Sequence, residues 1–202
     1  MNYLREYQQK LVSAQEAVKV VKSGDWVEHA FGVCGANELD QALAQRVDEL
    51  YDVKIRVDIG VWPHYTLEAD PTGEHFLWHS WHFGGLDRQY YNKGQLYYIP
   101  MKFHELPTMT RNNCEPTNVF MATVAPMDKH GYFSLGAGAP SAMAAAEKAD
   151  YVLVEVNTNM PRVLGGNQEH IHISQVDYVV EGSNPPLPTL PSAEPTEVEK
   201  KI

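Results

Sequence analysis

The chain has 202 residues, of which 44% are hydrophobic and 21% are charged. This balance is that of a folded globular protein, and the length allows one sizeable domain or two small ones. The 26 acidic and 16 basic side chains give a formal net charge of −10, and no run of Lys or Arg could follow a phosphate backbone. Nucleic-acid binding therefore has little support.

The sequence predicts neither a thiolate metal site nor a membrane segment. The two cysteines, Cys34 and Cys114, stand in different contexts without a CxxC partner, which also argues against a disulfide framework. The first residues are charged and helical, unlike the basic head and apolar run of a signal peptide. No apolar run approaches the roughly 18 residues of a membrane span, so a cytoplasmic protein is expected.

The first part of the chain predicts a helix and then a strand, turn and helix. Ser13 and Glu16 form a capping box at the start of a helix that Gly24 ends. Residues 25–31 alternate as in a strand, and a glycine turn leads, with Asn37 as the N-cap, into an amphipathic helix. Residues 52–62 supply the next strand.

The alternation of helices and strands continues to residue 157. Short helices are predicted at 84–94, 103–112 and 139–149, and strands at 95–100, 117–126, within 127–136 and at 150–157. This order predicts an α/β domain with an open sheet and helices on both faces, in which ligands bind where strands end. Residues 184–202 are rich in proline, and we expect an extended linker there after a domain of residues 1–183.

The glycine turn after the first strand is a candidate ligand site. It comprises Gly32, Val33, Cys34, Gly35, Ala36 and Asn37. Glycines leave backbone N–H groups open towards a ligand and the helix N-terminus favours negative charge, although a plain tight turn explains the same residues. The helix could also activate the Cys34 thiol as a nucleophile, but no base is identifiable, and a small buried residue is the better interpretation.

A second candidate segment follows the strand at 150–157. It combines amide groups, a rigid proline, a cation and flexible glycines, as a pocket wall does: Asn159, Met160, Pro161, Arg162, Gly165 and Gly166. Arg162 could hold an anion through its planar guanidinium. A surface turn with a solvated arginine remains an alternative.

The stretch EHFLWHSWHFGG at 74–85 holds three histidines, His75, His79 and His82. On a helix their spacing would stack them on one face as metal ligands, whereas on a strand His82 would face away from the other two. The aromatic residues between them favour the strand, so no metal ligands are assigned; a histidine-based metal-binding domain remains an alternative. His170 and His172 are too few ligands for a metal site.

Four segments together resemble the amino-terminal half of the acetyl-CoA hydrolase/transferase family: EYQQKLVSAQEAVKVVKSGDWV, TVAPMDKHGYFSLGAGAP, ADYVLVEVNTNMPRVLGG and HISQVDYVVEGSNPPLP. The resemblance runs in order over essentially the whole chain. Its most similar branch is the butyryl-CoA:acetate CoA-transferases, followed by the 4-hydroxybutyrate CoA-transferases. It implies a fold of the NagB/RpiA/CoA transferase type, with two similar α/β domains and an active site in the cleft between them.

The resemblance also implies a ping-pong reaction. In it, an enzyme glutamate takes CoA from an acyl-CoA as a glutamyl thioester and passes it to a second carboxylic acid. In the family this glutamate lies after the proline-rich linker, so no catalytic residue is expected in this chain, and neither Glu155 nor Glu181 replaces it. Coenzyme A is then a substrate, and no tightly bound cofactor is expected. The hydrolase branch, in which water replaces the acceptor acid, is an alternative activity.

The family resemblance gives the expected partners and the side of the domain that meets them. The partners are an acyl-CoA, a short-chain carboxylate, a carboxyl-terminal half of the enzyme and further copies of the chain. The turn at 32–37 and the segment at 159–166 should face the second domain, and a turn with Gly136 and Gly138 is a third candidate.

Within 74–85, Ser80 and His82 are expected to be pocket residues, and Trp78 and Trp81 packing residues. Without its second half, the domain should present an apolar patch on the face with the site and should self-associate. A stand-alone interaction module should present a polar face instead.

Overall fold

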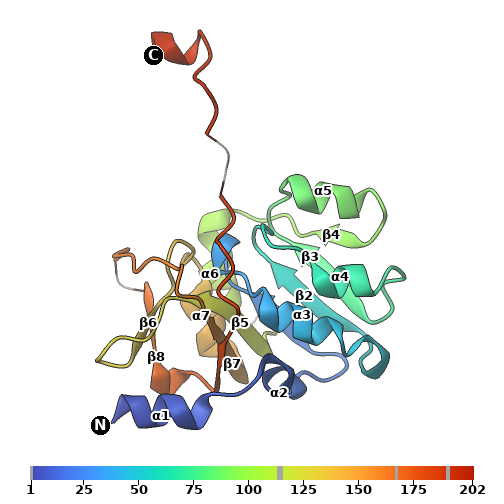
Figure 1. The fold of residues 1–202 in the computed structure, drawn as a ribbon. Coiled ribbons are helices and arrows are strands. Elements are labelled where there is room, and N and C mark those ends of the chain that lie inside the picture. Colours follow the sequence, from blue (N-terminus) through green and yellow to red (C-terminus); the bar gives the residue numbers. More distant parts are fainter. Residues whose placement is uncertain (1, 113–115, 167, 190–191) are drawn as a thin grey trace.

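The computed structural model describes residues 2–112, 116–166, 168–189 and 192–202, so Cys114 lies outside the described residues. Its main feature is a seven-stranded sheet in the order β4-β3-β2-β1-β5-β7-β9, in which every neighbouring pair is parallel (Figure 1). The strands are β1 (Trp26–His29), β2 (Val53–Val57), β3 (Phe76–Ser80), β4 (Leu96–Tyr98), β5 (Val119–Val124), β7 (Tyr151–Val156) and β9 (Tyr178–Glu181).

The strand order is that of a doubly wound sheet. From β1 the chain moves outward through β2 and β3 to β4, and then returns to place β5 on the other side of β1. The direction of winding therefore reverses between β1 and β5, which is where open α/β sheets bind ligands. The turn at 32–37 follows β1 at this reversal.

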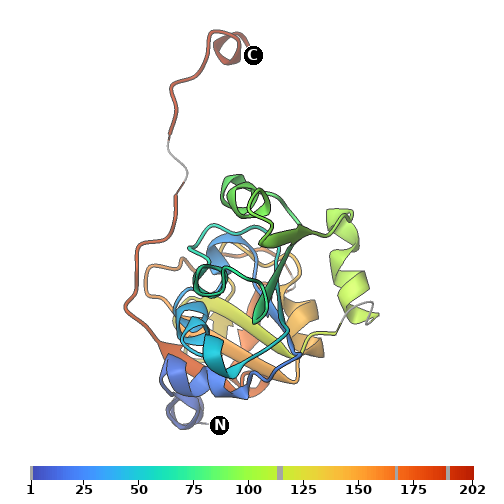
Figure 2. The same ribbon diagram turned by 90° about the vertical axis from the view of Figure 1, so that its right-hand side faces the viewer.

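Helices cover both faces of the sheet, as predicted (Figures 1 and 2). The buried residues of β5 alternate accordingly: Val119 and Met121 join an apolar cluster with α2 and α3, whereas Phe120 and Ala122 join a second cluster with α7. The helices are α1 (Tyr3–Lys10), α2 (Ala14–Ala17), α3 (Glu38–Ala44), α4 (Tyr65–Ala69), α5 (Gly85–Tyr91), α6 (Leu106–Arg111) and α7 (Ala142–Lys148).

A small antiparallel sheet covers part of the α7 face. It pairs β6 (Tyr132–Ser134) with β8 (His170–His172), and its buried residues Phe133 and Ile171 join the α7 cluster. The ring of Tyr132 packs edge-on against both histidines of β8. These histidines therefore take part in aromatic packing on the small sheet.

The predicted elements are confirmed, mostly with shorter bounds. The helix predicted after Ser13 is α2 followed by a 3-10 turn at Val18–Val20, and the Ser13 hydroxyl accepts a hydrogen bond from the Glu16 N–H at 3.2 Å. The histidine stretch forms β3, so the helical arrangement that would have stacked three imidazoles is wrong. β3 pairs on both sides in a parallel sheet, which suits its bulky aromatic residues.

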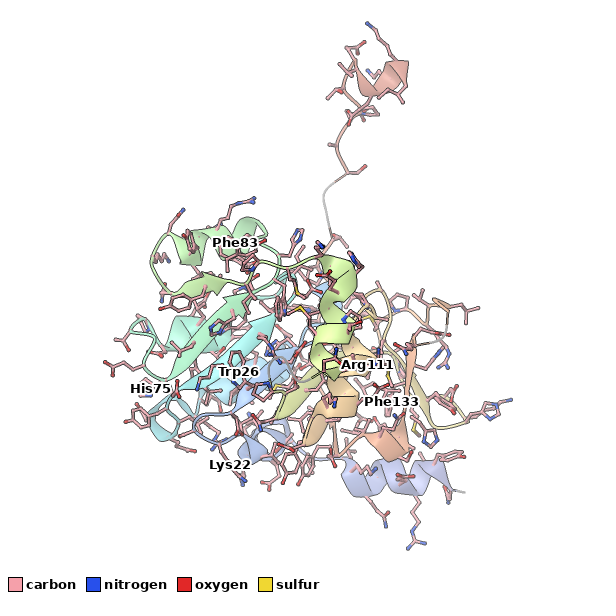
Figure 3. The ribbon with its side chains drawn as sticks, turned by 180° about the vertical axis from the view of Figure 1, so that it is seen from behind. Lys22, Trp26, His75, Phe83, Arg111 and Phe133 are labelled. Carbon is pink, nitrogen blue, oxygen red and sulfur yellow. The ribbon has the colours of Figure 1, made fainter. Side chains whose placement is uncertain are left out.

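The two ends of the parallel strands form different edges of the domain. In Figure 3, Lys22, which precedes β1, and Phe83, which follows β3, lie at opposite ends of the sheet. The carboxyl edge, where the strands end, carries the turn at 32–37 and the residues after β3 and β7. The candidate segments from three strands thus share one edge.

The last strand of the sheet, β9, ends at Glu181, just before the predicted domain boundary at residue 183, which stays a prediction. Residues 192–202 lie away from the domain body and end in a 3-10 turn at Glu199–Lys201 (Figures 1 and 2). None of the helices in the described part of the chain is long and apolar enough to cross a bilayer.

Phe120→Ala is expected to lower the free energy of unfolding by about 3 to 5 kcal/mol, because the ring is buried between β5 and α7. Leu164→Ala is the control, since this side chain is 88% exposed; its loss should stay below about 0.5 kcal/mol. Urea unfolding followed by circular dichroism measures both. An equally small loss in Phe120→Ala would contradict a packed core on this face.

Candidate functional site

Three of the candidate segments meet at the carboxyl edge beside the reversal of the sheet. The Cys34 thiol donates to the Leu135 carbonyl oxygen at 2.9 Å, and its sulfur lies 4.0 Å from the sulfur of Met160. Gly136 has φ +54°, and a Cβ on it would collide with the Met160 side chain. A Cβ on Gly138 would collide with the carbonyl oxygen of Phe31. The glycines thus let the three segments pack in direct contact.

Cys34 is a packing residue in this structure. Its side chain is fully buried, and burial raises the pKa of the thiol to about 11. A neutral, buried thiol is a poor nucleophile. The geometry therefore favours the structural interpretation of Cys34 over the nucleophilic one.

The carboxylate of Glu155, near the end of β7, holds the start of α3. It accepts hydrogen bonds from the backbone N–H groups of Asn37, Glu38 and Leu39 at 2.8, 2.8 and 2.9 Å. The Thr123 hydroxyl on β5 lies 2.7 Å from the same carboxylate. Asn37 occupies the N-cap position, as predicted, but its side chain makes no capping hydrogen bond, because Glu155 takes that role.

Asp40 anchors a buried polar network below the glycine turn. Its carboxylate accepts from the Tyr65 N–H at 2.8 Å and from the Thr66 hydroxyl at 2.8 Å, while the His29 Nε2 lies 3.9 Å away. Burial raises the pKa of Asp40 to about 6. Burial, reinforced by the nearby charge of His64, lowers the pKa of His29 to about 3. His29 is therefore neutral at pH 7.

A second part of this network joins β3 to α5. The His64 Nε2 lies 3.1 Å from Asp87, its ring stacks on Trp78, and the Gly84 N–H donates to the same Asp87 carboxylate at 3.0 Å. Ser80 is buried and donates to the His82 carbonyl oxygen at 3.1 Å, and its hydroxyl lies 3.3 Å from Asp87. Ser80 thus serves the buried network, whereas it was predicted to be a pocket residue.

Very little space separates this network from the glycine turn. A cavity lined by Gly32, Gly35, Ala36, His29 and His64 measures about 10 Å³. That is room for about one water molecule. Within this domain the turn therefore closes over the buried network, and a ligand can meet only its outer side.

The second candidate segment divides between two places. Asn159 lies at the carboxyl edge, where its side-chain NH₂ donates to the Asn184 carbonyl oxygen at 2.8 Å. Arg162 turns instead to the loop before β6 and pairs with Asp128 at 2.7 Å. Pro161, Gly165 and Gly166 are exposed. The structure therefore does not bring Arg162 or these glycines together with the glycine turn.

His82 lines a larger cavity that sequence reasoning largely missed. The cavity measures about 140 Å³ and lies at the ends of β2, β3 and β4; its lining residues are Asp58, Trp81, His82, Tyr98, Met101, Phe103 and Leu106. Asp58 directly follows the strand β2. A charged residue at that position, in a parallel sheet, was the available sequence signal for this site.

The other two histidines of the stretch pack against neighbouring groups. The His75 Nδ1 lies 2.8 Å from the Leu50 carbonyl oxygen, and the His79 ring lies beside the rings of Trp26 and Tyr97. Within the described residues, no three His, Cys, Asp or Glu side chains are grouped as metal ligands.

The winding of the sheet and the polar groups at its carboxyl edge define a doubly wound α/β domain with its ligand-binding edge at the strand ends. Residues 1–191 match the family described as the acetyl-CoA hydrolase/transferase N-terminal domain. The chain belongs to this family, as the resemblance of its segments predicts.

Curated relatives and solved structures agree with this assignment. The chain is 56% identical over 97% of its length to the "Probable butyrate:acetyl-CoA coenzyme A-transferase" of Syntrophomonas wolfei, and 48% identical over 100% to the butyryl-CoA:acetate CoA-transferase of Anaerostipes caccae. It spans 44% and 46% of those proteins, or about half their length.

Among solved structures, RipA from Yersinia pestis is similar with a TM-score of 0.84 and 29% identity, over 98% of this chain and 47% of RipA. A 4-hydroxybutyrate CoA-transferase from Porphyromonas gingivalis is similar with a TM-score of 0.68 and 25% identity, over 95% of this chain and 44% of that protein. The predicted CoA-transferase-like fold is therefore confirmed.

Glu155→Gln should lower the free energy of unfolding by about 2 to 4 kcal/mol, because its NH₂ group would face backbone N–H donors that then lack an acceptor. Glu147→Gln breaks only an exposed pair with Arg111 and should cost less than about 1 kcal/mol. Urea unfolding gives both values, and hydrogen exchange at residues 37–39 should accelerate only in Glu155→Gln. Equal losses would contradict the capping role.

His29 should make the protein acid-sensitive. Its pKa is lowered to about 3, so between pH 6.5 and 3 the unfolded chain binds a proton that the folded chain does not. The contribution of His29 to stability is therefore present above about pH 6.5 and should fall by about 2 kcal/mol by pH 5. The difference in unfolding free energy between the wild type and His29→Gln, measured at pH 7.5 and 5, tests this. His104→Gln, which changes an exposed histidine, is the control. A difference between the wild type and His29→Gln that is the same at both pH values would contradict the lowered pKa of His29.

Proposed function

We propose that the chain is the amino-terminal domain of an acyl-CoA:carboxylate CoA-transferase that acts on short-chain acids such as butyrate and acetate. The observation that carries this proposal is the match over 97% and 100% of the chain to two relatives named as transferases of this kind. The family name covers hydrolases as well, but both names favour transfer to a carboxylic acid over transfer to water.

In the proposed reaction a glutamate of the second half attacks the acyl-CoA carbonyl carbon and CoA leaves as a thiolate. The resulting mixed anhydride is opened by that thiolate, which forms the glutamyl-CoA thioester and releases the first acid. An acceptor carboxylate then attacks the thioester and forms a second anhydride, and the released CoA thiolate attacks its acyl carbonyl. This last step yields the new acyl-CoA and the free glutamate.

Two glutamates at or near strand ends have partners within this chain, which supports the assignment of the nucleophile to the second half. Glu155 is committed to the start of α3. Glu181 lies at the end of β9 and accepts a hydrogen bond from the Tyr7 hydroxyl at 2.5 Å. A nucleophilic carboxylate needs access to a substrate carbonyl, and Glu155 in particular lacks it.

The carboxyl edge has the properties of a surface that a second domain covers. Tyr91, Tyr98 and Phe103 are exposed there, and Phe83 contacts the rings of Tyr91 and Tyr98. The Asn157 side-chain NH₂ also donates to the Pro185 carbonyl oxygen at 2.9 Å, which fixes the start of the proline-rich segment at this edge. An exposed aromatic cluster favours association, either with a second half or with further copies of the chain.

The chain alone should not exchange CoA between butyryl-CoA and acetate, whereas its mixture with the carboxyl-terminal half of the Anaerostipes caccae relative should do so. Formation of acetyl-CoA, followed by chromatography, measures the exchange. The control mixture carries a second half whose proposed nucleophilic glutamate is replaced by glutamine. Exchange by the chain alone would contradict the assignment of the nucleophile to the other half.

A further inference from the structure

Two residues that line the cavity at the ends of β2, β3 and β4 carry buried polar atoms whose hydrogen-bonding capacity is unused. In the described part of the chain, neither Asp58 Oδ2 nor Trp81 Nε1 has a hydrogen-bond partner. Asp58 is only 4% exposed and Trp81 only 9%. Leaving such groups without a partner costs about 1 to 3 kcal/mol each, so a folded protein retains them where something else binds them.

Strand register holds the two groups side by side. Val57 of β2 is the partner of Ser80 of β3, and the Trp81 N–H extends the ladder by donating to the Val57 carbonyl oxygen at 3.0 Å. Asp58 and Trp81 therefore occupy adjacent positions on the same face of the sheet. The Ile99 N–H donates to the Ser80 carbonyl oxygen at 2.9 Å, which brings the end of β4 to the same place. Asp58 and Trp81 directly follow two paired strands, which makes their backbone geometry rigid.

The remaining lining residues of the cavity are mostly apolar or aromatic. Met101 and Leu106 contribute apolar side chains, and Phe103 is 55% exposed at the opening. His82 is exposed beside it. At about 140 Å³ the cavity has room for several water molecules, which suits a small organic acid and is too little for coenzyme A.

We propose that this cavity binds a short-chain monocarboxylic acid, with the carboxylate between Asp58, Trp81 and His82 and the alkyl chain against Met101 and Leu106. A carboxylate only accepts hydrogen bonds, so it satisfies the indole N–H of Trp81. It also accepts the proton of a neutral Asp58 carboxyl group. The choice of acid rests on the proposed function, whereas the presence of the site rests on the cavity.

The charges around Asp58 favour its neutral form. Burial, and then the negative charge of Glu28 on β1, raise the pKa of Asp58 to about 7. Arg56 on β2 is engaged by Glu28 at 2.7 Å and by the Thr117 hydroxyl at 2.8 Å. The other titratable groups that line the cavity are His82, after β3, and Tyr98, on β4. Below pH 7 the Asp58 carboxyl group is thus mostly protonated and can donate a hydrogen bond to a bound carboxylate. Above pH 7 it is mostly an anion and repels that carboxylate.

Butyrate binding to the 202-residue chain tests the proposal, with the Trp81 indole N–H resonance as the reporter and calorimetry for affinity. Butyrate should shift this resonance, which Trp81→Phe identifies by its disappearance. Butyramide, which lacks the charge, and butylammonium, which inverts it, should bind at least tenfold more weakly. Equal binding of butyramide, tighter binding of butylammonium, or no shift with butyrate would overturn the proposal and leave water as the occupant.

The pH dependence tests the role of Asp58. Butyrate affinity should fall about tenfold between pH 6 and pH 8, because the carboxyl donor is lost as pH rises through about 7. Asp58→Asn keeps a donor at every pH, so its affinity should vary less than twofold over this range. Exposed Asp48→Asn should behave as the wild type. His82→Gln should keep the tenfold fall in butyrate affinity. If this variant lost the fall, the assignment of the pH dependence to Asp58 would be overturned.

The outcomes also separate this inference from the proposed function. The KM for butyrate is measured in the reverse exchange, with acetyl-CoA as donor and butyrate as acceptor. If the mixture of both halves exchanges CoA and Trp81→Phe leaves this KM unchanged, the proposed function stands and this inference fails. If the chain binds butyrate as described but the mixture exchanges no CoA, the inference stands and the proposed function fails. A rise of at least tenfold in KM for butyrate, with kcat within twofold, is the result expected if both are correct.

Discussion

The carboxylate of Glu155 is the interaction on which the carboxyl edge depends. It reaches from β7 to three backbone N–H groups at the start of α3. The Thr123 hydroxyl of β5 lies 2.7 Å from this carboxylate and 2.8 Å from the Gly35 carbonyl oxygen. One buried group therefore connects two strands, the glycine turn and a helix at the reversal of the sheet. Burial raises the pKa of Glu155, and the hydrogen bonds from the Thr123 hydroxyl and the three backbone N–H groups oppose that rise.

Local sequence patterns predicted most of the fold because a parallel sheet buries whole strands. The apolar runs that became β5 and β7 are buried on both faces of the sheet, and their length and flanking turns distinguish them from helices. The order of these elements along the chain, together with the family resemblance, then indicated the open sheet. The capping role of Glu155 was not predictable in this way, because its partners lie more than 100 residues earlier in the chain.

The candidate site was predicted only in part, for a similar physical reason. Sequence reasoning assigned His82 to a pocket but not Asp58, since their meeting depends on the register between β2 and β3. It grouped Arg162 with Asn159, although the chain between them leaves the carboxyl edge and Arg162 pairs with Asp128. Proximity along the chain was therefore a poor guide to which side chains share a surface.

The buried polar groups at this edge fall into two classes, and the difference indicates where a ligand belongs. Asp40 and Asp87 each have several hydrogen-bond donors within the domain, so they fix the loops in place without a ligand. Asp58 and Trp81 have unused hydrogen-bonding capacity and face a cavity whose mouth carries the exposed Phe103. In the proposed enzyme, a second domain over that mouth would exclude water. It would thereby strengthen the hydrogen bonds to a bound acid in a medium of lower dielectric constant.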